Sequence, residues 1–261
     1  MNAFKKDPLV QQVTAYVKEY MKNYDSSHDF DHITRVVSLA HHIYAHSPNK
    51  SSLDLRTIHL SALLHDVGDK KYLLPNQDPS TMISSLLVSP SFSCPPDLAS
   101  KIQEICLSVS YSSEIKDPSR VARLIEQHPE LAVVQDADRL DAIGAVGIGR
   151  MFTFGGAKGG GRSLRDTMDH LDEKLVKLED MMKTPVGRMM ARERTERLEM
   201  FKGWWGEEVS VVEEAGGGGD ETQVEEVEEV EEVEEIEGGK EKVKGGQQHV
   251  RMGVEEWMNG N

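Results

Sequence analysis

The sequence predicts an all-α fold, on three observations. Apolar residues in residues 1–206 recur three and four positions apart, which is the spacing of a helix that buries one face. Aspartate–proline and threonine–proline pairs, which are typical of helix starts, precede several of these runs. No stretch of this part alternates apolar and polar residues as a half-buried strand does. We therefore expect a bundle of helices without a sheet.

Three helices are expected in the N-terminal third of the chain. The first runs over about 8–23. The second begins after a cap at Ser26 or Ser27 and ends near Ser47-Pro48. The third runs over about 53–67. The first begins at Asp7-Pro8, because the aspartate can cap a helix whose first residue is proline. Gly68 is predicted to end the third, since glycine readily adopts the left-handed conformation found after helix ends.

Proline and glycine residues divide the rest of this part of the chain. Helix starts are expected at Asp78-Pro79 and at Pro95-Pro96-Asp97, with a break at Pro129. The next predicted helix runs from Val133 to Phe154, and its many glycines and alanines would let a neighbouring backbone approach closely. The sequence GGAKGGGRS at 155–163 predicts a loop. Helices over about 163–183 and 185–205 then follow, the second opened by Thr184-Pro185.

Acidic residues are concentrated at the C-terminal end of the sequence. Residues 207–261 hold 18 acidic and 4 basic residues, whereas residues 1–206 hold 27 and 26. Glycines 216–219 predict a flexible linker, and the apolar residues of the following EEV repeat drift around a helix without forming one face. We expect residues 1–206 to form one domain and residues 207–261 to form a disordered acidic tail. A transient helix, or docking on a basic protein partner, is the alternative for the tail.

The composition argues against several classes of protein. The near-neutral residues 1–206 carry no excess of positive charge, so no nucleic-acid polymer is expected as a partner. No signal peptide is evident, and no stretch approaches the roughly 18 uninterrupted apolar residues of a membrane span, so no membrane partner is expected. Cys94 and Cys106 are too few for a disulfide scaffold. We therefore expect a soluble protein of the cytoplasm or the nucleus.

Three motifs carry side chains that can bind a cation. They are HDFDH at 28–32, ALLHDVGD at 62–69 and QDADRLDA at 135–142. Their donors His32, His65, Asp66 and Asp138 offer two imidazole nitrogens and two carboxylates. Such a set with open positions suits one Mn²⁺, Co²⁺, Ni²⁺, Fe²⁺ or Mg²⁺ ion that keeps bound water, better than it suits structural zinc. Among ten histidines a His–Asp pair also arises by chance, so the prediction depends on the three motifs together.

The same motifs resemble the H…HD…D signature of the HD superfamily of metal-dependent phosphohydrolases. The resemblance rests on His32 with Arg35-Val36, SALLHDVGD at 61–69 and DADRLDAIGAVGI at 136–148, and extends over about residues 8–206. It implies an HD-domain helical bundle and a divalent ion held by His32, His65, Asp66 and Asp138. It also implies that Asp138 is the ligand, whereas Asp136 and Asp141 support the ligands or pack helices, and Arg139 pairs with one of these two.

The resemblance also implies a mechanism in which a metal-bound water attacks a phosphoryl group. Asp69 is the candidate catalytic carboxylate, which would orient or deprotonate this water or protonate the leaving oxygen. Lys70, Lys71 and Arg35 are candidates to bind phosphate oxygens, and His28 to bind phosphate or protonate a leaving group. The structural alternatives are a cap or an ion pair with Lys70 for Asp69, and complementation of a helix dipole for the lysines. A capping role is the alternative for His28.

The predicted function is hydrolysis of a small phosphorylated metabolite, and the preferred substrate is a nucleotide. The protein would act as a pyrophosphohydrolase or as a phosphomonoesterase. Two-metal phosphodiesterases and di-iron oxygenases of the HD type need further histidines before the final aspartate, and only His128 lies between Asp66 and Asp138. One metal ion is therefore preferred. A non-catalytic nucleotide-sensing scaffold is the other alternative, although no member of the ligand set is missing. The oligomeric state is not predicted.

Overall fold

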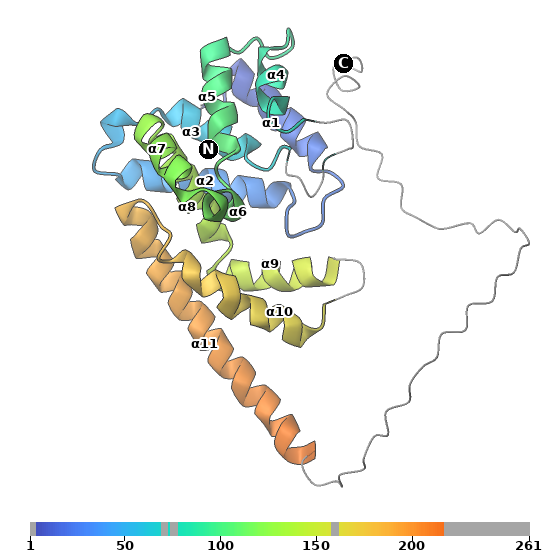
Figure 1. Ribbon diagram of the computed structural model, residues 1–261. Coiled ribbons are helices and arrows are strands. Elements are labelled where there is room, and N and C mark those ends of the chain that lie inside the picture. Colours follow the sequence, from blue (N-terminus) through green and yellow to red (C-terminus); the bar gives the residue numbers. More distant parts are fainter. Residues whose placement is uncertain (1–3, 69–72, 74–77, 158–161, 217–261) are drawn as a thin grey trace, which may run out of the picture. The chain divides into compact units, whose positions relative to one another are not determined.

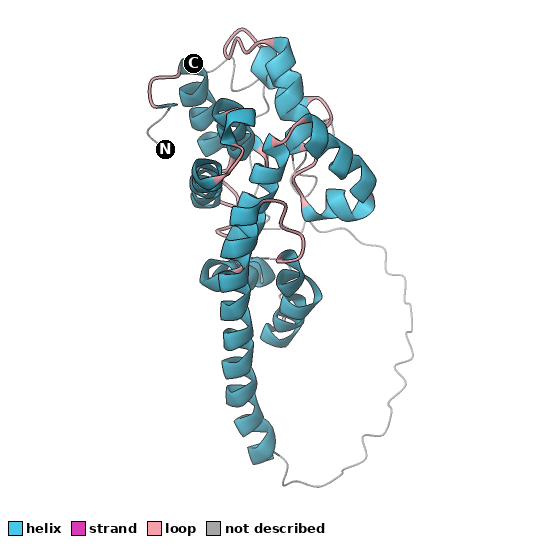
Figure 2. Ribbon diagram, turned by 90° about the vertical axis from the view of Figure 1, so that its left-hand side faces the viewer, coloured by secondary structure: helices cyan, strands magenta, loops and turns pink. Residues whose placement is uncertain are grey.

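All the secondary structure that the computed structural model describes is helical (Figures 1 and 2). The described residues are 4–68, 73, 78–157 and 162–216, and no strand occurs within them. None of the helices in these ranges has the length and apolar character needed to cross a membrane. The predicted all-α fold is thus confirmed.

The α-helices have the following bounds. They are α1 (Pro8–Tyr20), α2 (Phe30–His46), α3 (Leu55–Leu64), α4 (Met82–Val88), α5 (Pro96–Cys106), α6 (Tyr111–Lys116), α7 (Pro118–Gln127), α8 (Glu130–Asp141), α9 (Gly144–Ala157), α10 (Leu164–His170) and α11 (Pro185–Gly216). Short 3₁₀ turns lie at η2 (Lys50–Ser52) and η4 (Val176–Leu178), and a π-helical turn, η3, covers Leu171–Leu175.

Side-chain caps explain where the first helices begin. Asp7 accepts hydrogen bonds from the backbone N–H groups of Leu9 and Val10, as expected for the start of α1. The cap of α2 is Asp29 and not Ser26 or Ser27, so this prediction was wrong. Aspartate and serine cap helices about equally well, and Asp29 is the residue whose carboxylate reaches the first turn, where it accepts from His32 N–H at 3.0 Å.

The predicted helix over 133–154 is divided into α8 and α9. The chain turns at Gly144, whose φ of +71° lies in the left-handed region that favours glycine. α9 then continues through Gly155 and Gly156 to Ala157, so the predicted loop at 155–163 begins later than expected. Gly155 packs so closely against the side chain of Thr167 in α10 that a Cβ atom would lie 2.6 Å from Oγ1. Gly155 and Gly156 would otherwise weaken the helix, and this close packing of Gly155 stabilises the helical conformation there.

The C-terminal helices also differ from the sequence prediction. The segment expected as one helix over 163–183 is α10 followed by η3 and η4. The helix expected over 185–205 runs on to Gly216, because Gly206 alone does not break it and the glycine run begins only at residue 216. Residues 207–216, expected in a disordered tail, are therefore helical. The rest of the acidic segment lies outside the described residues.

The described residues divide into two units, one that ends at Phe201 and one that begins at Lys202 within α11. In the first unit α2 packs extensively against both α3 and α8, and α3 packs in turn against α1 and α5. The inner face of α2 is closed to solvent, and its buried apolar residues are Ile33, Val36, Val37, Ala40 and Ile43. The three central helices α2, α3 and α8 are the ones that carry the sequence motifs, so the core brings those motifs together.

Candidate metal centre

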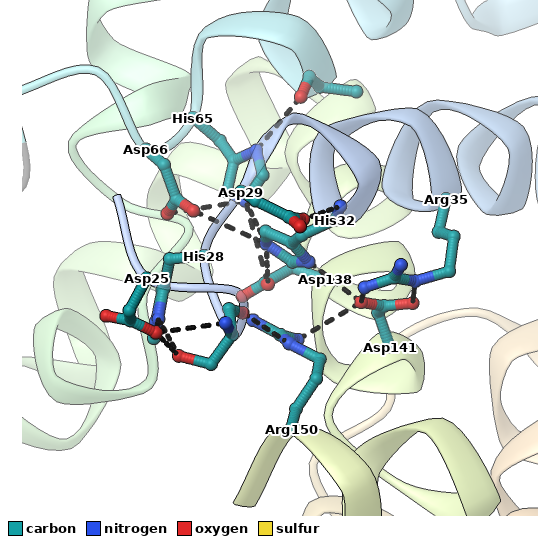
Figure 3. A network of polar contacts seen from close by, with 12 residues as sticks. Asp25, His28, Asp29, His32, Arg35, His65, Asp66, Asp138, Asp141 and Arg150 are labelled. Atoms are coloured by element: carbon teal, nitrogen blue, oxygen red, sulfur yellow. Dashed lines mark hydrogen bonds and ion pairs between the residues drawn. The ribbon is translucent and has the colours of Figure 1, made fainter. Parts of the chain in front are cut away.

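Four side chains from three helices converge on one point (Figure 3). They are His32 in the first turn of α2, His65 and Asp66 directly after α3, and Asp138 in α8. α3 ends at Leu64, earlier than the predicted end near residue 67, and the adjacent His65 and Asp66 can therefore turn toward the same point.

The donor atoms of this cluster lie close together. The Nε2 atoms of His32 and His65 are 3.3 Å apart. The carboxylate of Asp66 lies 3.3 Å from the first of these nitrogens and 3.4 Å from the second. One oxygen of Asp138, Oδ1, lies 3.6 Å from both. Ligand atoms bound at the usual 2.0–2.1 Å from one ion would lie roughly 2.9–3.4 Å from each other, so the spacing suits a shared cation.

Both imidazole rings turn their Nε2 atoms toward the centre. The Nδ1 atom of His65 lies 2.9 Å from the carbonyl oxygen of Ala62, which can only accept a hydrogen bond. The Nδ1 atom of His32 lies 2.8 Å from Oδ2 of Asp141. Each ring therefore has its Nδ1 position occupied by a protein acceptor and its Nε2 position free for the centre.

Burial and an unsatisfied oxygen also fit a metal ion. The side chains of His32 and His65 are buried, and Asp66 Oδ2 is enclosed without accepting a hydrogen bond. A buried carboxylate oxygen without a donor is costly unless a cation neutralises it. Donor atoms of His32, His65 and Asp66 lie within 4.8 Å of one another, as a set that could hold a metal requires. The described residues thus fit the divalent ion that the sequence predicts.

The electrostatics of the cluster favour positive charge at its centre. Burial alone would raise the pKa of Asp66, but His65 and His32 hold that pKa well below its usual range. Burial would likewise lower the pKa of His65, yet the carboxylates of Asp66 and Asp138 raise it to about 9. Without a metal ion, the site therefore attracts a proton.

Arg35 lies beside this cluster but points to Asp141. Its Nε and Nη2 atoms donate to the two carboxylate oxygens of Asp141 at 2.8 and 3.1 Å. Arg150 of α9 donates to the same carboxylate at 3.2 Å and to the carbonyl of Ser27 at 2.7 Å. Arg150 could not be predicted from the sequence, because nothing in the spacing of residues shows that α9 returns to the start of α2.

The expected partner of Arg139 was wrong. Arg139 pairs with Glu114 of α6 and donates to the carbonyl of Met181, and it bonds neither Asp136 nor Asp141. Asp136 instead accepts from the backbone N–H groups of Lys183 and Thr184 just before α11. Asp136 therefore packs helices together, whereas Asp141 contacts a residue of the cluster.

His28 lies in the turn before α2, and so does not share a helical face with His32. Its ring centre is nevertheless 6.2 Å from that of His32 and 5.5 Å from that of Phe154 in α9. Its Nδ1 atom is 2.7 Å from the hydroxyl of Ser27. The fold thus brings His28 close to the cluster from the turn that precedes α2.

Three predicted site residues cannot be placed in the fold. Asp69, Lys70 and Lys71 lie outside the described residues, which stop at Gly68 and resume briefly at Leu73. Gly68 itself has the predicted left-handed conformation, with φ of +83°. The roles of these three residues stay predictions.

Comparisons with known proteins show a family and a relative to which this chain is similar. The model of the HD domain family matches residues 29–143, a range that contains all four converging side chains. The uncharacterized protein YpgQ of Bacillus subtilis is 34% identical over 192 residues, which cover 70% of this chain and 85% of YpgQ.

Solved structures show the same likeness. The crystal structure of Bacillus subtilis YpgQ in complex with ADP has a TM-score of 0.58 and 32% identity, over 77% of this chain and 94% of that one. An HD-superfamily hydrolase from Bacillus thuringiensis has a TM-score of 0.50 and 29% identity, over 77% and 96%. A protein from Lactobacillus plantarum has a TM-score of 0.62 and 26% identity, over 78% and 98%.

Proposed function

Because this chain belongs to the HD domain family, whose members are usually metal-dependent hydrolases, we propose that it is a phosphohydrolase dependent on one divalent metal ion. The observation that carries the proposal is the convergence of two Nε2 atoms and two carboxylates in a buried cluster. The substrate class that we propose is a small phosphorylated metabolite, and a nucleotide in particular.

The residues His32, His65, Asp66 and Asp138 would hold the ion. When bound, a divalent ion lowers the pKa of a coordinated water toward neutrality and polarises a phosphoryl oxygen. Four protein donors leave open positions on Mn²⁺, Co²⁺, Ni²⁺, Fe²⁺ or Mg²⁺, all of which accept mixed nitrogen and oxygen ligands. The donor set supports a hydrolytic centre and does not select among these ions.

Four further residues would act on the substrate. Asp69 follows Asp66 by three positions, and we propose that it orients or deprotonates the attacking water or protonates the leaving oxygen. Lys70 and Lys71 would bind phosphate oxygens. Arg35 gives Nε and Nη2 to Asp141, while its Nη1 atom has no hydrogen-bond partner among the described residues and is available to a phosphate.

His28 is the remaining substrate-binding candidate. Its ring lies beside that of His32 and packs near Phe154, so a phosphate or leaving oxygen at the metal would be within reach of this turn. The Ser27 hydroxyl at its Nδ1 atom orients the ring, and Nε2 is the atom that we propose to act on a substrate.

The preference for a nucleotide rests on similarity. YpgQ was crystallised in complex with ADP, and it shares 32% identity with this chain across most of both chains. We extend a nucleotide ligand to this chain on that ground. Pyrophosphohydrolysis and phosphomonoester hydrolysis both fit the donor set, and their products differ, so one assay separates them.

Two other functions are kept as alternatives. A nucleotide-sensing scaffold would bind the same ligand without turnover, and a di-iron oxygenase would need a second set of metal ligands. Within the described residues one group of three or more side chains has the spacing of a metal site, and it contains His32, His65 and Asp66. This supports a single ion and a hydrolytic role.

The experiment uses the full chain. The protein is stripped of metal, and the release of phosphate and pyrophosphate is measured on a panel of nucleotides and sugar phosphates with Mn²⁺, Co²⁺, Ni²⁺, Fe²⁺ or Mg²⁺. His65→Ala should abolish both metal binding and release. His128→Ala is the matched control, because His128 pairs with exposed Glu104 away from the cluster, and it should keep both.

The outcomes separate the alternatives. Metal-dependent release that His65→Ala abolishes and His128→Ala retains would support the phosphohydrolase, and the product would identify its type. Nucleotide and metal binding without any release would favour the sensing scaffold. A wild-type chain that binds no divalent ion would overturn the proposed metal centre.

A further inference from the structure

Asp141 is a buried carboxylate with partners from two other helices (Figure 3). It ends α8, three residues after Asp138, and its side chain is only 2% exposed. Its Oδ2 atom lies 2.8 Å from Nδ1 of His32, a residue 109 positions earlier in the chain. Arg35 and Arg150 donate to the same carboxylate, at 2.8 to 3.2 Å. Burying these charged groups together costs free energy of folding. The four predicted metal ligands do not by themselves account for the presence of this charged group.

The two arginines keep Asp141 ionised. Arg35 donates to both carboxylate oxygens and Arg150 donates to one of them, and two such guanidinium partners favour the charged form of the carboxylate. An ionised carboxylate can only accept hydrogen bonds. Any N–H group between Asp141 and His32 must therefore be on the imidazole.

This contact decides which nitrogen of His32 carries the proton. A neutral imidazole has one N–H group, and Asp141 draws it to Nδ1, which leaves the lone pair of Nε2 facing the cluster. His65 has a corresponding acceptor for its Nδ1 position nearby in the sequence, the carbonyl of Ala62 in α3. His32 has no such local acceptor at Nδ1 among the described residues, so its orientation depends on a side chain from α8.

We propose that Asp141 is a positioning residue for the metal centre, which, with Arg35 and Arg150 as its counter-ions, holds His32 in the tautomer whose Nε2 atom binds the ion. The proposal rests on the metal centre of the proposed function and assigns no contact with substrate to Asp141. Arg150 also donates a hydrogen bond to the carbonyl of Ser27. The same arginine therefore contacts both Asp141 and the turn that precedes α2. Residues from α2, α8 and α9 thus act together on one ligand.

The chain offers a matched control in Asp136. It lies on α8, is as buried as Asp141, and also accepts several hydrogen bonds, but its partners are backbone and hydroxyl groups of Lys183 and Thr184. Loss of its charge should weaken the fold without altering His32. Comparison of Asp141→Asn with Asp136→Asn therefore separates positioning of a ligand from general support of α8.

The first measurement is the dissociation constant of Mn²⁺ from the full-length protein by titration calorimetry. Asp141→Asn should raise it ten- to a hundredfold, which is the usual effect of removing a carboxylate that orients a metal-binding histidine. Asp136→Asn should leave it within about twofold of wild type. An unchanged dissociation constant in folded Asp141→Asn, or an equal loss in both variants, would overturn the proposal.

The second measurement reads the tautomer directly and needs no metal. In the metal-free wild type, nitrogen-15 NMR of the histidine rings should show the proton of neutral His32 on Nδ1. In Asp141→Asn the His32 signals should move toward a mixture of tautomers, while those of Ala62-bonded His65 keep their positions. Unchanged His32 signals in this variant would contradict the assignment.

The two proposals fail in different ways. A wild-type protein that binds no Mn²⁺ would remove the metal centre, whereas normal binding by Asp141→Asn would remove only the role of Asp141. Should Asp141→Asn not fold, Arg150→Gln takes its place, since it retains the carboxylate but removes one counter-ion and the bond to Ser27. It should weaken Mn²⁺ binding severalfold, and wild-type affinity would overturn the proposal.

Discussion

The Nε2 atoms of His32 and His65 lie 3.3 Å apart, although the Nδ1 atom of each ring faces an acceptor. Two neutral rings in this state would direct lone pairs at each other, with the carboxylates of Asp66 and Asp138 alongside. Such an arrangement is stable only with a cation between the rings. In the metal-free protein a proton meets this need, because the carboxylates of Asp66 and Asp138 outweigh burial and raise the pKa of His65 to about 9.

Asp138→Ala should abolish metal binding, and Asp136→Ala should not. Asp138 contributes the oxygen that lies 3.6 Å from both Nε2 atoms, so its removal leaves the cluster with one carboxylate. We expect the dissociation constant of Mn²⁺ to rise at least a hundredfold, as measured by calorimetry on the full chain. Turnover in the phosphate-release assay should disappear with it.

The control variant Asp136→Ala should bind Mn²⁺ as wild type does but unfold more easily. It leaves the N–H groups of Lys183 and Thr184 without their acceptor, at a cost of about 1–3 kcal/mol for each group that stays buried. Urea unfolding measures this loss. Retained metal in Asp138→Ala with lost metal in Asp136→Ala would reverse the assignment of the ligand.

Glu114→Ala should lower the free energy of unfolding by about 3–5 kcal/mol. The carboxylate of Glu114 accepts from Arg139, which is 2% exposed, and from Lys183 at 2.6 Å. Its removal leaves the buried guanidinium without its counter-ion. Urea unfolding should show a much smaller effect, within about 1 kcal/mol, for Glu104→Ala, whose pair with His128 is exposed. Equal losses of unfolding free energy in both variants would show that the buried pair stabilises the protein no more than the exposed pair does.

Two glycine substitutions in α11 should have opposite effects on stability. A Cβ atom at Gly187 would collide with the carboxylate of Asp136 and with Thr184 Oγ1, so Gly187→Ala should cost about 1–3 kcal/mol. At Gly203 a Cβ atom would meet nothing within 4 Å, so Gly203→Ala should stabilise the helix by about 0.5–1 kcal/mol. Thermal and urea unfolding measure both. Stabilisation by Gly187→Ala would refute the close contact with Asp136.

Local signals predicted several helix starts, but not the start expected at Asp78-Pro79, where α4 begins only at Met82. Asp7-Pro8 and Pro96 mark helix starts that the structure confirms, and Gly68 adopts the expected conformation. The choice between Ser27 and Asp29 as a cap could not be made in this way, because both side chains can accept the same hydrogen bond. The path of the backbone into α2 determines which of the two side chains caps the helix.

The sequence indicated which donor side chains the fold brings together, but not the side chains that contact them. His32, His65, Asp66 and Asp138 belong to motifs that can be recognised in the sequence, and the fold brings them together. The contact of Arg150 with Asp141 depends on the turn at Gly144, which redirects the chain into α9. Several glycines lie in this segment, and local sequence does not indicate which of them adopts a positive φ.

A second pair of histidines lies outside the metal cluster and should affect the acid stability of the protein. His59 in α3 is 5% exposed, and its Nδ1 atom lies 2.8 Å from Nε2 of His41 in α2. Phe4 packs against both rings, and Asp7 is the carboxylate that acts on His59. Burial, and then the neighbouring His41, lowers the pKa of His59 to about 4.

Acid should therefore destabilise the wild type more than His59→Gln. The unfolded chain takes up a proton on His59 below about pH 6.5, whereas the folded protein resists it down to about pH 4. The stability that neutral His59 contributes is thus complete above pH 6.5 and decreases as the pH falls toward 4, by about 2 kcal/mol at pH 5. Urea unfolding at pH 7.5 and 5.0 measures the difference, with exposed His46→Gln as the control. Parallel pH profiles for wild type and His59→Gln would show that His59 already binds a proton in the folded state.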